Sequence, residues 1–97
     1  MLKIGFGLEG AVVIAGRLDA AQAATAQAFL DGVNGSVVLD CTALEYLSSA
    51  GLGVLLKTQK RLKAASGALR LTGVNRHVHD IFRYAGFDQI FEITAAP

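Results

Sequence analysis

A short run of apolar residues, SVVLD at 36–40, does most to limit the folds open to this chain. The run is shorter than a typical helix, and continuous apolar runs of this length suit a strand that is buried on both faces. Segments with helical character flank it at about 19–31 and 49–66. A buried strand between two helices indicates an α/β fold, in which helices pack on a sheet.

The segment before the first helix predicts a hairpin. Residues 2–7 alternate weakly, residues 11–16 are β-branched and apolar, and Gly10 between them allows a tight turn. Asp19 is then expected to cap the first helix, which is rich in alanine and is expected to end at Gly32.

The segment after the second helix continues the alternation. ALRLTGV at 68–74 predicts a strand, Asn75 is expected to cap a third helix that ends at Gly86, and QIFEI at 89–93 predicts a last strand. The expected order is therefore ββαβαβαβ. This order predicts a mixed four- to five-stranded sheet with about three to four helices on its faces and right-handed crossovers, in a single domain spanning 1–97.

The composition argues against several classes of protein. Nine Lys and Arg are balanced by eight Asp and Glu, for a formal net charge of +1, whereas a general nucleic-acid binder carries an unbalanced basic surface. No apolar run approaches the ~20 residues of a membrane span, and the N-terminus lacks the pattern of a signal peptide. The single cysteine, Cys41, can form neither an internal disulfide nor a zinc framework. We therefore expect a cytoplasmic protein.

The long second helix has a predicted core side and a predicted solvent side, and Gly67 is expected just past its end, at the position called C′. The core side is expected to hold Leu52, Leu55, Leu56, Gln59 and Leu62, which recur at helical spacing. The opposite side is expected to hold Val54, Lys57, Thr58 and Arg61. Val54 is apolar on this otherwise polar side, so we expect it to contact a partner.

The start of the same helix combines two serines with two glycines. Ser48 and Ser49 lie where the helix begins, and serine is a good N-cap because its oxygen accepts a hydrogen bond from an amide of the first turn. A phosphate there would also meet free amides and the positive end of the helix dipole. Gly51 and Gly53 each cost about 1 kcal/mol of helix propensity, and they would let another surface approach the backbone. The alternative is that one serine only caps the helix and the glycines only fit it to the sheet.

Residues 40–56 resemble the signature of the STAS family, and of its anti-sigma factor antagonists in particular. Asp40 matches the aspartate at the end of the family's strand, and Thr42 matches the Ser or Thr that follows it. Ser49 falls on the family's phosphorylated serine, two residues before Gly51. Many members have aspartate immediately before the phosphoserine, where this chain has Ser48, so Ser48 is the second choice for the acceptor.

Two further segments carry the resemblance along the chain. Gly-Arg-Leu-Asp at 16–19 looks like the family's element before the first helix, and Tyr-Ala-Gly-Phe-Asp at 84–88 looks like its element after the third. The resemblance implies a binding module that is not an enzyme and that uses no cofactor or metal. Its implied partner-binding residues are Asp40, Ser48, Ser49, Ala50, Gly51, Gly53, Val54, Lys57, Thr58 and Arg61.

The resemblance also implies a switch. The unphosphorylated domain would bind an anti-sigma factor that is a serine kinase of the histidine-kinase-like ATPase class, and so release a sigma factor. That kinase, with ATP and Mg²⁺, would phosphorylate Ser49, and a phosphatase would reset the cycle. One alternative is a STAS subunit of a lipid transport system that docks on the transport ATPase without a phosphate switch. Another is a regulator of secretion or motility that is controlled by a different kinase and phosphatase.

Other combinations of reactive residues fit their context poorly. Ser49 with a histidine and an aspartate could suggest a hydrolase triad, but no Gly-x-Ser-x-Gly turn is present. His77 and His79 are two apart in a predicted helix, so they point to different sides and cannot chelate one metal. Gly-x-Gly-x-x-Gly at 5–10 lies in a predicted hairpin and not between a strand and a helix, so it does not indicate a dinucleotide site.

Overall fold

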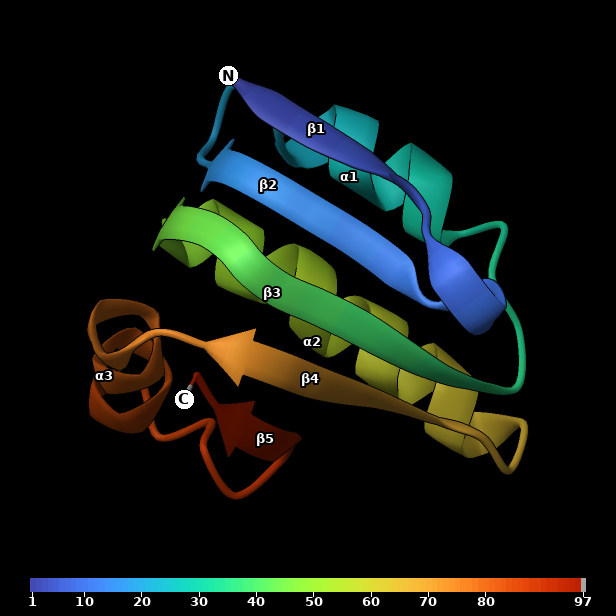
Figure 1. Cartoon of the computed structure of the whole chain (residues 1–97). Coiled ribbons are helices and arrows are strands. Elements are labelled where there is room, and N and C mark those ends of the chain that lie inside the picture. The colour runs from blue at the N-terminus through green and yellow to red at the C-terminus, as the bar shows by residue number, and fades with distance from the viewer. Residues whose placement is uncertain (97) are drawn as a thin grey trace.

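The computed structural model describes residues 1–96, and its strands and helices follow the predicted order (Figure 1). The elements are β1 (Leu2–Phe6), a 3-10 turn η1 (Leu8–Gly10), β2 (Val12–Leu18), α1 (Ala23–Leu30), β3 (Ser36–Leu47), α2 (Ser49–Ala64), β4 (Ala68–Val74), α3 (Arg76–Tyr84) and β5 (Glu92–Ala95). The predicted α/β fold with a mixed sheet is therefore confirmed. Within residues 1–96, no helix has the length and apolar content that a membrane crossing requires.

The five strands form one sheet in the order β1-β2-β3-β4-β5. β1 pairs with β2 in antiparallel fashion, as the predicted hairpin requires, and β2 through β5 are parallel. β3 lies in the middle, where Leu39 pairs with Val12 on one side and Leu71 on the other. The apolar run at 36–40 is thus the central strand of the sheet.

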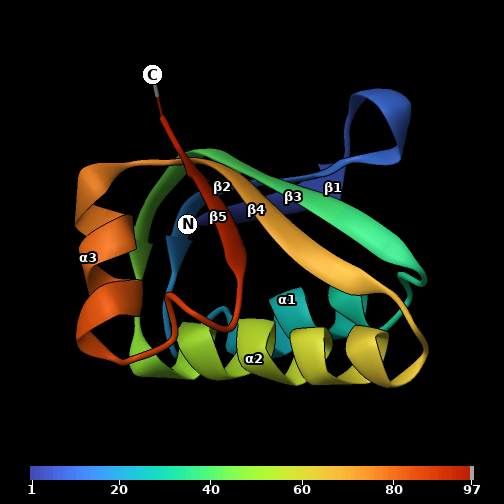
Figure 2. The same cartoon turned by 90° about the horizontal axis from the view of Figure 1, so that it is seen from below.

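The helices all lie on one side of this sheet, whereas the sequence predicted helices on its faces. Figure 2 shows α1 and α2 side by side under the strands, with α3 at one end of the same side. The strand order explains the difference. Each crossover moves to the next strand in the same direction, so right-handed crossovers place every helix on the same face.

The core fills the layer between the sheet and the helices. Its residues come from alternate positions of the strands, such as Ile14, Leu39 and Leu71, all of which are fully buried. Phe82 of α3 meets Phe91 edge to face, with 5.3 Å between the ring centroids, and closes the core at one end.

Two predicted element boundaries in the first half are wrong. β3 does not end at Asp40 but continues to Leu47, because residues 43–47 pair with β2 beyond a register shift. α1 begins at Ala23 and not next to Asp19. The Asp19 carboxylate accepts a hydrogen bond from the Gln22 amide at 3.2 Å, so it stabilises the turn before the helix and does not cap the helix itself.

The end of α2 also differs from the prediction. Ser66 has the left-handed conformation, with φ of 67°, and Gly67 follows it at the position called C″. The Gly67 amide donates to the Leu62 carbonyl at 2.7 Å, which is the long hydrogen bond of a Schellman motif. Glycine is needed at position 67 because a Cβ there would collide with the backbone of Gly35.

The third helix follows the prediction, and the last strand is shifted. The Asn75 side chain accepts from the Val78 amide at 2.8 Å, and Gly86, with φ of 78°, ends the helix. The last strand covers Glu92–Ala95, three residues later than expected, because residues 88–90 form a turn.

Candidate partner-binding site

Ser48 is the N-cap of α2. Its Oγ accepts a hydrogen bond from the Gly51 amide at 3.2 Å, and its own amide donates to the Leu18 carbonyl at 3.0 Å. Its carbonyl accepts the first helical hydrogen bond, from Leu52 at 2.9 Å. The side chain and backbone of Ser48 therefore join the end of β3 to β2 and α2.

Ser49 is the first residue of α2 and is exposed. Its hydroxyl takes no part in the hydrogen bonds made among residues 1–96. Because the first amides of a helix have no partner within the helix, the amides of Ser49 and Ala50 remain available beside it. No acidic side chain lies in the first turn of α2. A phosphate at this position would therefore meet unpaired donors and the positive end of the helix dipole.

The two glycines of the first turns have different roles. Gly51 is buried, and a Cβ on it would lie 2.6 Å from the Leu18 carbonyl oxygen and 2.8 Å from the Leu47 side chain. Gly51 therefore fits α2 to the end of the sheet. For this glycine the structure agrees with the alternative hypothesis, that it only allows the helix to pack on the sheet. Gly53 is exposed, and nothing lies within 4 Å of a Cβ built on it, so it leaves the surface of α2 open.

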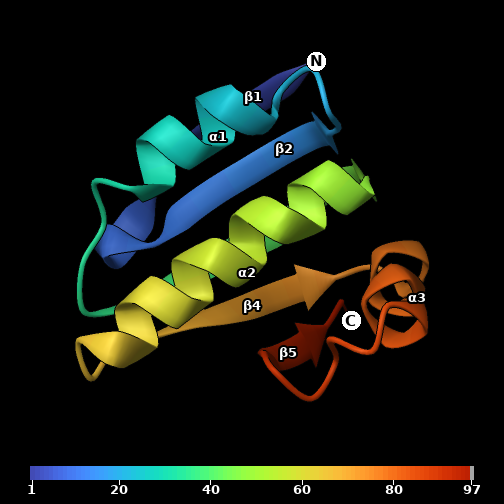
Figure 3. The same ribbon diagram turned by 180° about the vertical axis from the view of Figure 1, so that it is seen from behind.

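The predicted solvent side of α2 is wrong at Val54 and Thr58. Val54 is only 7 % exposed and belongs to the core, and Thr58 is 1 % exposed. The Thr58 hydroxyl donates to the Val54 carbonyl at 2.9 Å, which satisfies its polar group inside the protein. The reason is that α2 packs against α1 as well as against the sheet, which Figure 3 shows from the helix side. Val54 and Thr58 therefore cannot be surface contacts.

Arg61 also belongs to this contact between the two helices and not to a free surface. Its Nη2 donates to the carbonyls of Leu30 at 2.8 Å and Val33 at 2.6 Å, and its Nη1 donates to the Asn34 side chain at 3.4 Å. Leu30 is the last residue of α1, so the guanidinium satisfies carbonyls at that helix end. Arg61 thus holds the loop after α1 to α2.

The exposed residues of α2, apart from Lys63 and Ala64 at its C-terminal end, form one stripe along the helix, called here the α2 face. It consists of Ser49, Ala50, Gly53, Lys57 and Lys60, all exposed. Ser49, Gly53 and Lys57 are four residues apart, so they follow one another along the helix. Because α2 contains no Asp or Glu, the α2 face carries only positive charge. It includes four of the predicted partner-binding residues.

Asp40 lies away from this site, contrary to the prediction. It sits within β3 between the buried Leu39 and Cys41, so its side chain points to the open face of the sheet. Seven residues, all in β3, lie between Asp40 and Ser48, and these eight residue steps span about 26 Å if fully extended. Its carboxylate accepts from the Thr42 amide at 3.0 Å and the Thr42 hydroxyl at 2.6 Å, and these bonds lower its pKa. Asp40 therefore orders the strand and does not orient the Ser48 turn.

A stack of three side chains lies at the end of the sheet next to Ser48, and it was not predicted from the sequence. The Arg17 guanidinium lies 4.2 Å from the centre of the Tyr46 ring, and His77 of α3 stacks on Tyr46 at 6.4 Å. Arg17 pairs with Tyr46 in the register of β2 and β3, one residue before the Leu18–Leu47 pair that precedes Ser48. The sequence cannot predict this stack, because the register that joins its residues includes a bulge.

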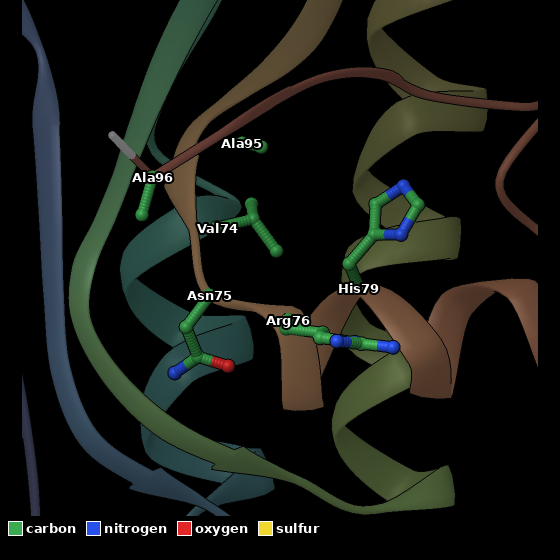
Figure 4. A pocket seen from close by; sticks show the side chains of 6 residues that line it. All are labelled: Val74, Asn75, Arg76, His79, Ala95 and Ala96. Carbon is green, nitrogen blue, oxygen red and sulfur yellow. The ribbon is translucent and has the colours of Figure 1, made fainter.

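A hollow of about 450 Å³ lies at the start of α3 and not at the serine pair (Figure 4). It is lined by Val74, Asn75, Arg76, His79, Ala95 and Ala96. His79 points into it, and Ser49 is not among the lining residues. The residues of the triad considered above do not converge there. Among residues 1–96, no three His, Cys, Asp or Glu side chains gather as a metal site would require.

Comparison with known proteins supports the resemblance. A protein of Bordetella bronchiseptica named as an anti-sigma factor antagonist, BtrV, is 44 % identical over 57 residues, which are 59 % of this chain and 49 % of that protein. The chain therefore aligns with about half the length of this curated relative.

Solved structures share the fold. A Thermotoga maritima protein described as an anti-sigma factor antagonist superposes with a TM-score of 0.79 at 18 % identity, over 98 % of this chain and 86 % of its own. Unphosphorylated SpoIIAA, an anti-sigma factor antagonist, gives 0.74 at 20 % identity, over 96 % and 87 %. A sulfate transporter family protein of Wolinella succinogenes gives 0.66 at 14 % identity, over 95 % and 81 %.

The family comparison covers nearly the whole chain. The family described as "Mlab, STAS domain" matches residues 7–94, from the end of β1 into β5. The match includes the Ser48–Ser49 turn, all three helices and the central strands. The chain therefore belongs to the STAS domain family.

Proposed function

We propose that this chain is an anti-sigma factor antagonist, a binding module that docks an anti-sigma factor through the α2 face and is switched off by phosphorylation of Ser49. The observation that carries the proposal is the difference between the two serines. The Ser48 hydroxyl oxygen accepts a hydrogen bond from the Gly51 amide, whereas Ser49 is exposed and its hydroxyl makes no hydrogen bond among residues 1–96. The similarity to an anti-sigma factor antagonist of Bordetella bronchiseptica supports the same function.

The α2 face suits a protein partner of opposite charge. Gly53 leaves the helix surface without a side chain one turn after Ser49, so a partner can approach the backbone closely. Lys57 and Lys60 extend the face with positive charge. An acidic surface on the partner would complement these lysines and speed the encounter.

The phosphate acts differently in the free domain and in the complex. It adds about −1.5 to −2 charge at neutral pH. In the free domain this charge meets water, the unpaired amides of Ser49 and Ala50, and the positive end of the α2 dipole, so the fold tolerates it. Under a docked partner the same charge would lose its water, and burying an unpaired charge costs several kcal/mol. Phosphorylation therefore releases the partner without unfolding the domain.

The nucleotide chemistry belongs to the partner. We propose that the anti-sigma factor is also an ATP-dependent serine kinase of the histidine-kinase-like ATPase class. Its bound ATP, with Mg²⁺, transfers the γ-phosphoryl group to the Ser49 oxygen, which yields ADP and releases the hydroxyl proton. A separate phosphatase hydrolyses the phosphoserine and restores the binding form. This chain supplies only the acceptor hydroxyl and the docking surface.

The test uses the purified protein with its cognate kinase. Incubation with ATP should place one phosphate on Ser49, as mapped by mass spectrometry, and should abolish binding in a pull-down or by calorimetry. Ser49→Ala should bind and resist release by ATP, and Gly53→Trp should fold but bind poorly because it fills the open surface of α2. Phosphate on Ser48 alone would reassign the acceptor. Normal binding by Gly53→Trp would remove the α2 face from the docking site.

A second candidate function is a subunit of a transport system, in which the α2 face docks on a transport ATPase and no phosphate is added. Two comparisons favour it: the matching family carries the description "Mlab, STAS domain", and a sulfate transporter family protein shares the fold. Binding to a transport ATPase from the same genome that Ser49→Asp leaves unchanged would support this function over the phosphate switch.

A further inference from the structure

The outer edge of β1 is an unpaired strand edge with apolar character. β1 is the first strand of the sheet and pairs only with β2, so one of its sides is free (Figure 1). Protein edges are usually protected by proline, by several charges or by a covering element. The sequence of β1, LKIGF, contains no proline, and Lys3 is its one charged residue.

Apolar side chains continue from this edge into the adjoining turn. Phe6 is 68 % exposed and Leu8 is 89 % exposed, which are high values for large apolar side chains. The Phe6 ring touches Phe29 of α1, with 5.1 Å between the ring centroids. The exposed apolar surface therefore extends from the hairpin onto α1, which lies in front of β1 in Figure 3.

The pairing of β1 with β2 shows which backbone groups face outward. The Arg17 amide donates to the Met1 carbonyl at 3.1 Å, and the Gly7 amide donates to the Ala11 carbonyl at 2.7 Å. Hydrogen-bonded residues alternate along an antiparallel strand, so Met1, Lys3, Gly5 and Gly7 direct their backbone groups toward β2. The amides and carbonyls of Leu2, Ile4 and Phe6 consequently point away from the sheet.

We propose that a second copy of this chain pairs with that edge, so that two β1 strands run antiparallel about a two-fold axis at Ile4. In this register Ile4 faces Ile4 of the second copy, and Leu2 faces its Phe6. All three outward-facing residues then form hydrogen-bonded pairs, which gives about six backbone hydrogen bonds. The two sheets join into one continuous sheet, and the contact is closed because it is symmetric.

The side chains fit the same register on both faces of the sheet. On the helix face, the exposed Phe6 ring lies opposite Leu2 of the second copy, so apolar groups meet. On the open face, Lys3 lies opposite Gly5 of the second copy, so the lone charge of the strand meets no like charge. A register shifted by one residue at each strand, with Lys3 opposite Lys3, would place like charges together and destabilise the pair.

The first helix is compatible with this contact. Residues 20–30 contain no charged side chain, and the exposed positions of α1 include Ala24, Thr25 and Ala28. These side chains are small, so α1 of one copy can lie close to α1 of the other across the two-fold axis. The opposite edge of the sheet offers less to a partner, because β5 has four residues and its register with β4 is broken.

Gly5 provides a test in which only the sign of a charge changes. A Cβ on Gly5 has nothing within 4 Å, so Ala, Lys and Glu are each tolerated by the single copy. In the proposed dimer residue 5 lies opposite Lys3 at two symmetric places. Relative to Gly5→Ala, Gly5→Glu should lower the dissociation constant and Gly5→Lys should raise it, each by roughly two- to thirty-fold, measured by sedimentation equilibrium.

The controls separate this contact from others. Gly53→Lys adds the same charge at an equally open position on α2 and should leave the dissociation constant unchanged. The double variant Lys3→Glu with Gly5→Lys restores opposite charges and should restore pairing. A protein that stays monomeric up to about 1 mM, or equal dissociation constants for the Lys and Glu variants, would overturn the proposal. Growth into open fibres would also overturn it, since a symmetric contact ends at two copies.

Crosslinking tests the register directly. Residues 3 and 5 of opposite copies form a non-hydrogen-bonded pair, whose Cα atoms lie about 4.5 Å apart, within the range that a disulfide spans. The variant with both Lys3→Cys and Gly5→Cys should therefore form a covalent dimer in oxidised glutathione, whereas Lys3→Cys alone should not. A double variant that remains monomeric would refute the register. Neither experiment involves a kinase, so both are independent of the phosphate switch.

Discussion

The Ser48 Oγ atom accepts a hydrogen bond from the Gly51 amide at 3.2 Å, and this contact separates a structural serine from a free one. Ser48→Ala should lower the free energy of unfolding by about 1 kcal/mol, because it leaves an amide of the first turn of α2 without its cap. Ser49→Ala should change it by less than about 0.5 kcal/mol, because Ser49 is exposed. Urea denaturation of both variants would measure the difference, and equal losses would contradict the assignment.

The two glycines of α2 should respond in opposite directions to the same substitution. Gly51→Ala places a Cβ 2.6 Å from the Leu18 carbonyl oxygen, so α2 must shift and stability should fall by roughly 1–3 kcal/mol. Gly53→Ala meets open space and gains helix propensity, so stability should rise by up to about 1 kcal/mol. Thermal or urea unfolding of the pair would test this. A destabilised Gly53→Ala would mean that the α2 backbone at Gly53 is not regular helix.

Much of the fold could be predicted from local patterns. The run at 68–74, the Asn75 cap and the glycine turn at Gly86 each depend on neighbouring residues, and all three occur as predicted. The length of β3 could not be predicted, because residues 43–47 become a strand only through pairing with β2. Long-range pairing of this kind leaves little trace in local sequence.

The site could be predicted only in part, and α2 shows why. The position of the serine pair follows from the turn into the helix and was predicted. The orientation of the helix was not fully predicted, because α2 packs on two neighbours and its buried arc is wider than one apolar stripe. Thr58 is the clearest example, since it is polar yet 1 % exposed, with its hydroxyl bonded to the Val54 carbonyl. Polarity alone could not reveal a hydroxyl that is satisfied within its own helix.

Val54→Asp should unfold the domain and not merely weaken a surface contact. Val54 is 7 % exposed within the core, and a carboxylate there would be buried without a partner, a change that costs several kcal/mol. Lys57→Glu, three residues later on the exposed α2 face, should leave stability within about 0.5 kcal/mol. Circular dichroism would distinguish an unfolded variant from a folded one. A folded Val54→Asp would contradict the packing of α2 against α1.

Asp40 should make the protein more sensitive to acid. The Thr42 hydroxyl and amide both donate to its carboxylate and hold its pKa below the usual value of 3.8. The ionised form is therefore favoured in the folded state, so the stabilisation is present above that value and is lost as the pH falls through the lowered pKa. Thr42→Val removes the hydroxyl bond, so it should cost stability at neutral pH and much less at about pH 2. An equal cost at both pH values would contradict this role.

Cys41, the next residue along β3, should behave in the opposite way. Its side chain points into the core, and burial, together with the negative charge of Asp40, raises the pKa of its thiol to about 12. The thiolate is the reactive form of cysteine, so the folded protein should resist alkylation at neutral pH and react only on unfolding. A rate of labelling equal to that of a denatured sample would contradict the burial.

The same thiol should shape stability at alkaline pH. In the unfolded chain it loses its proton near its ordinary pKa of 9.0, whereas in the folded protein it keeps that proton to about 12. Between these values the unfolded state binds fewer protons, so the free energy of unfolding decreases as the pH rises. Cys41→Ala has no thiol to titrate, so its stability should decline less steeply above pH 9.0 than that of the parent protein. Comparing the two slopes in urea cancels what the two proteins have in common, and parallel slopes would contradict the raised pKa of the folded thiol.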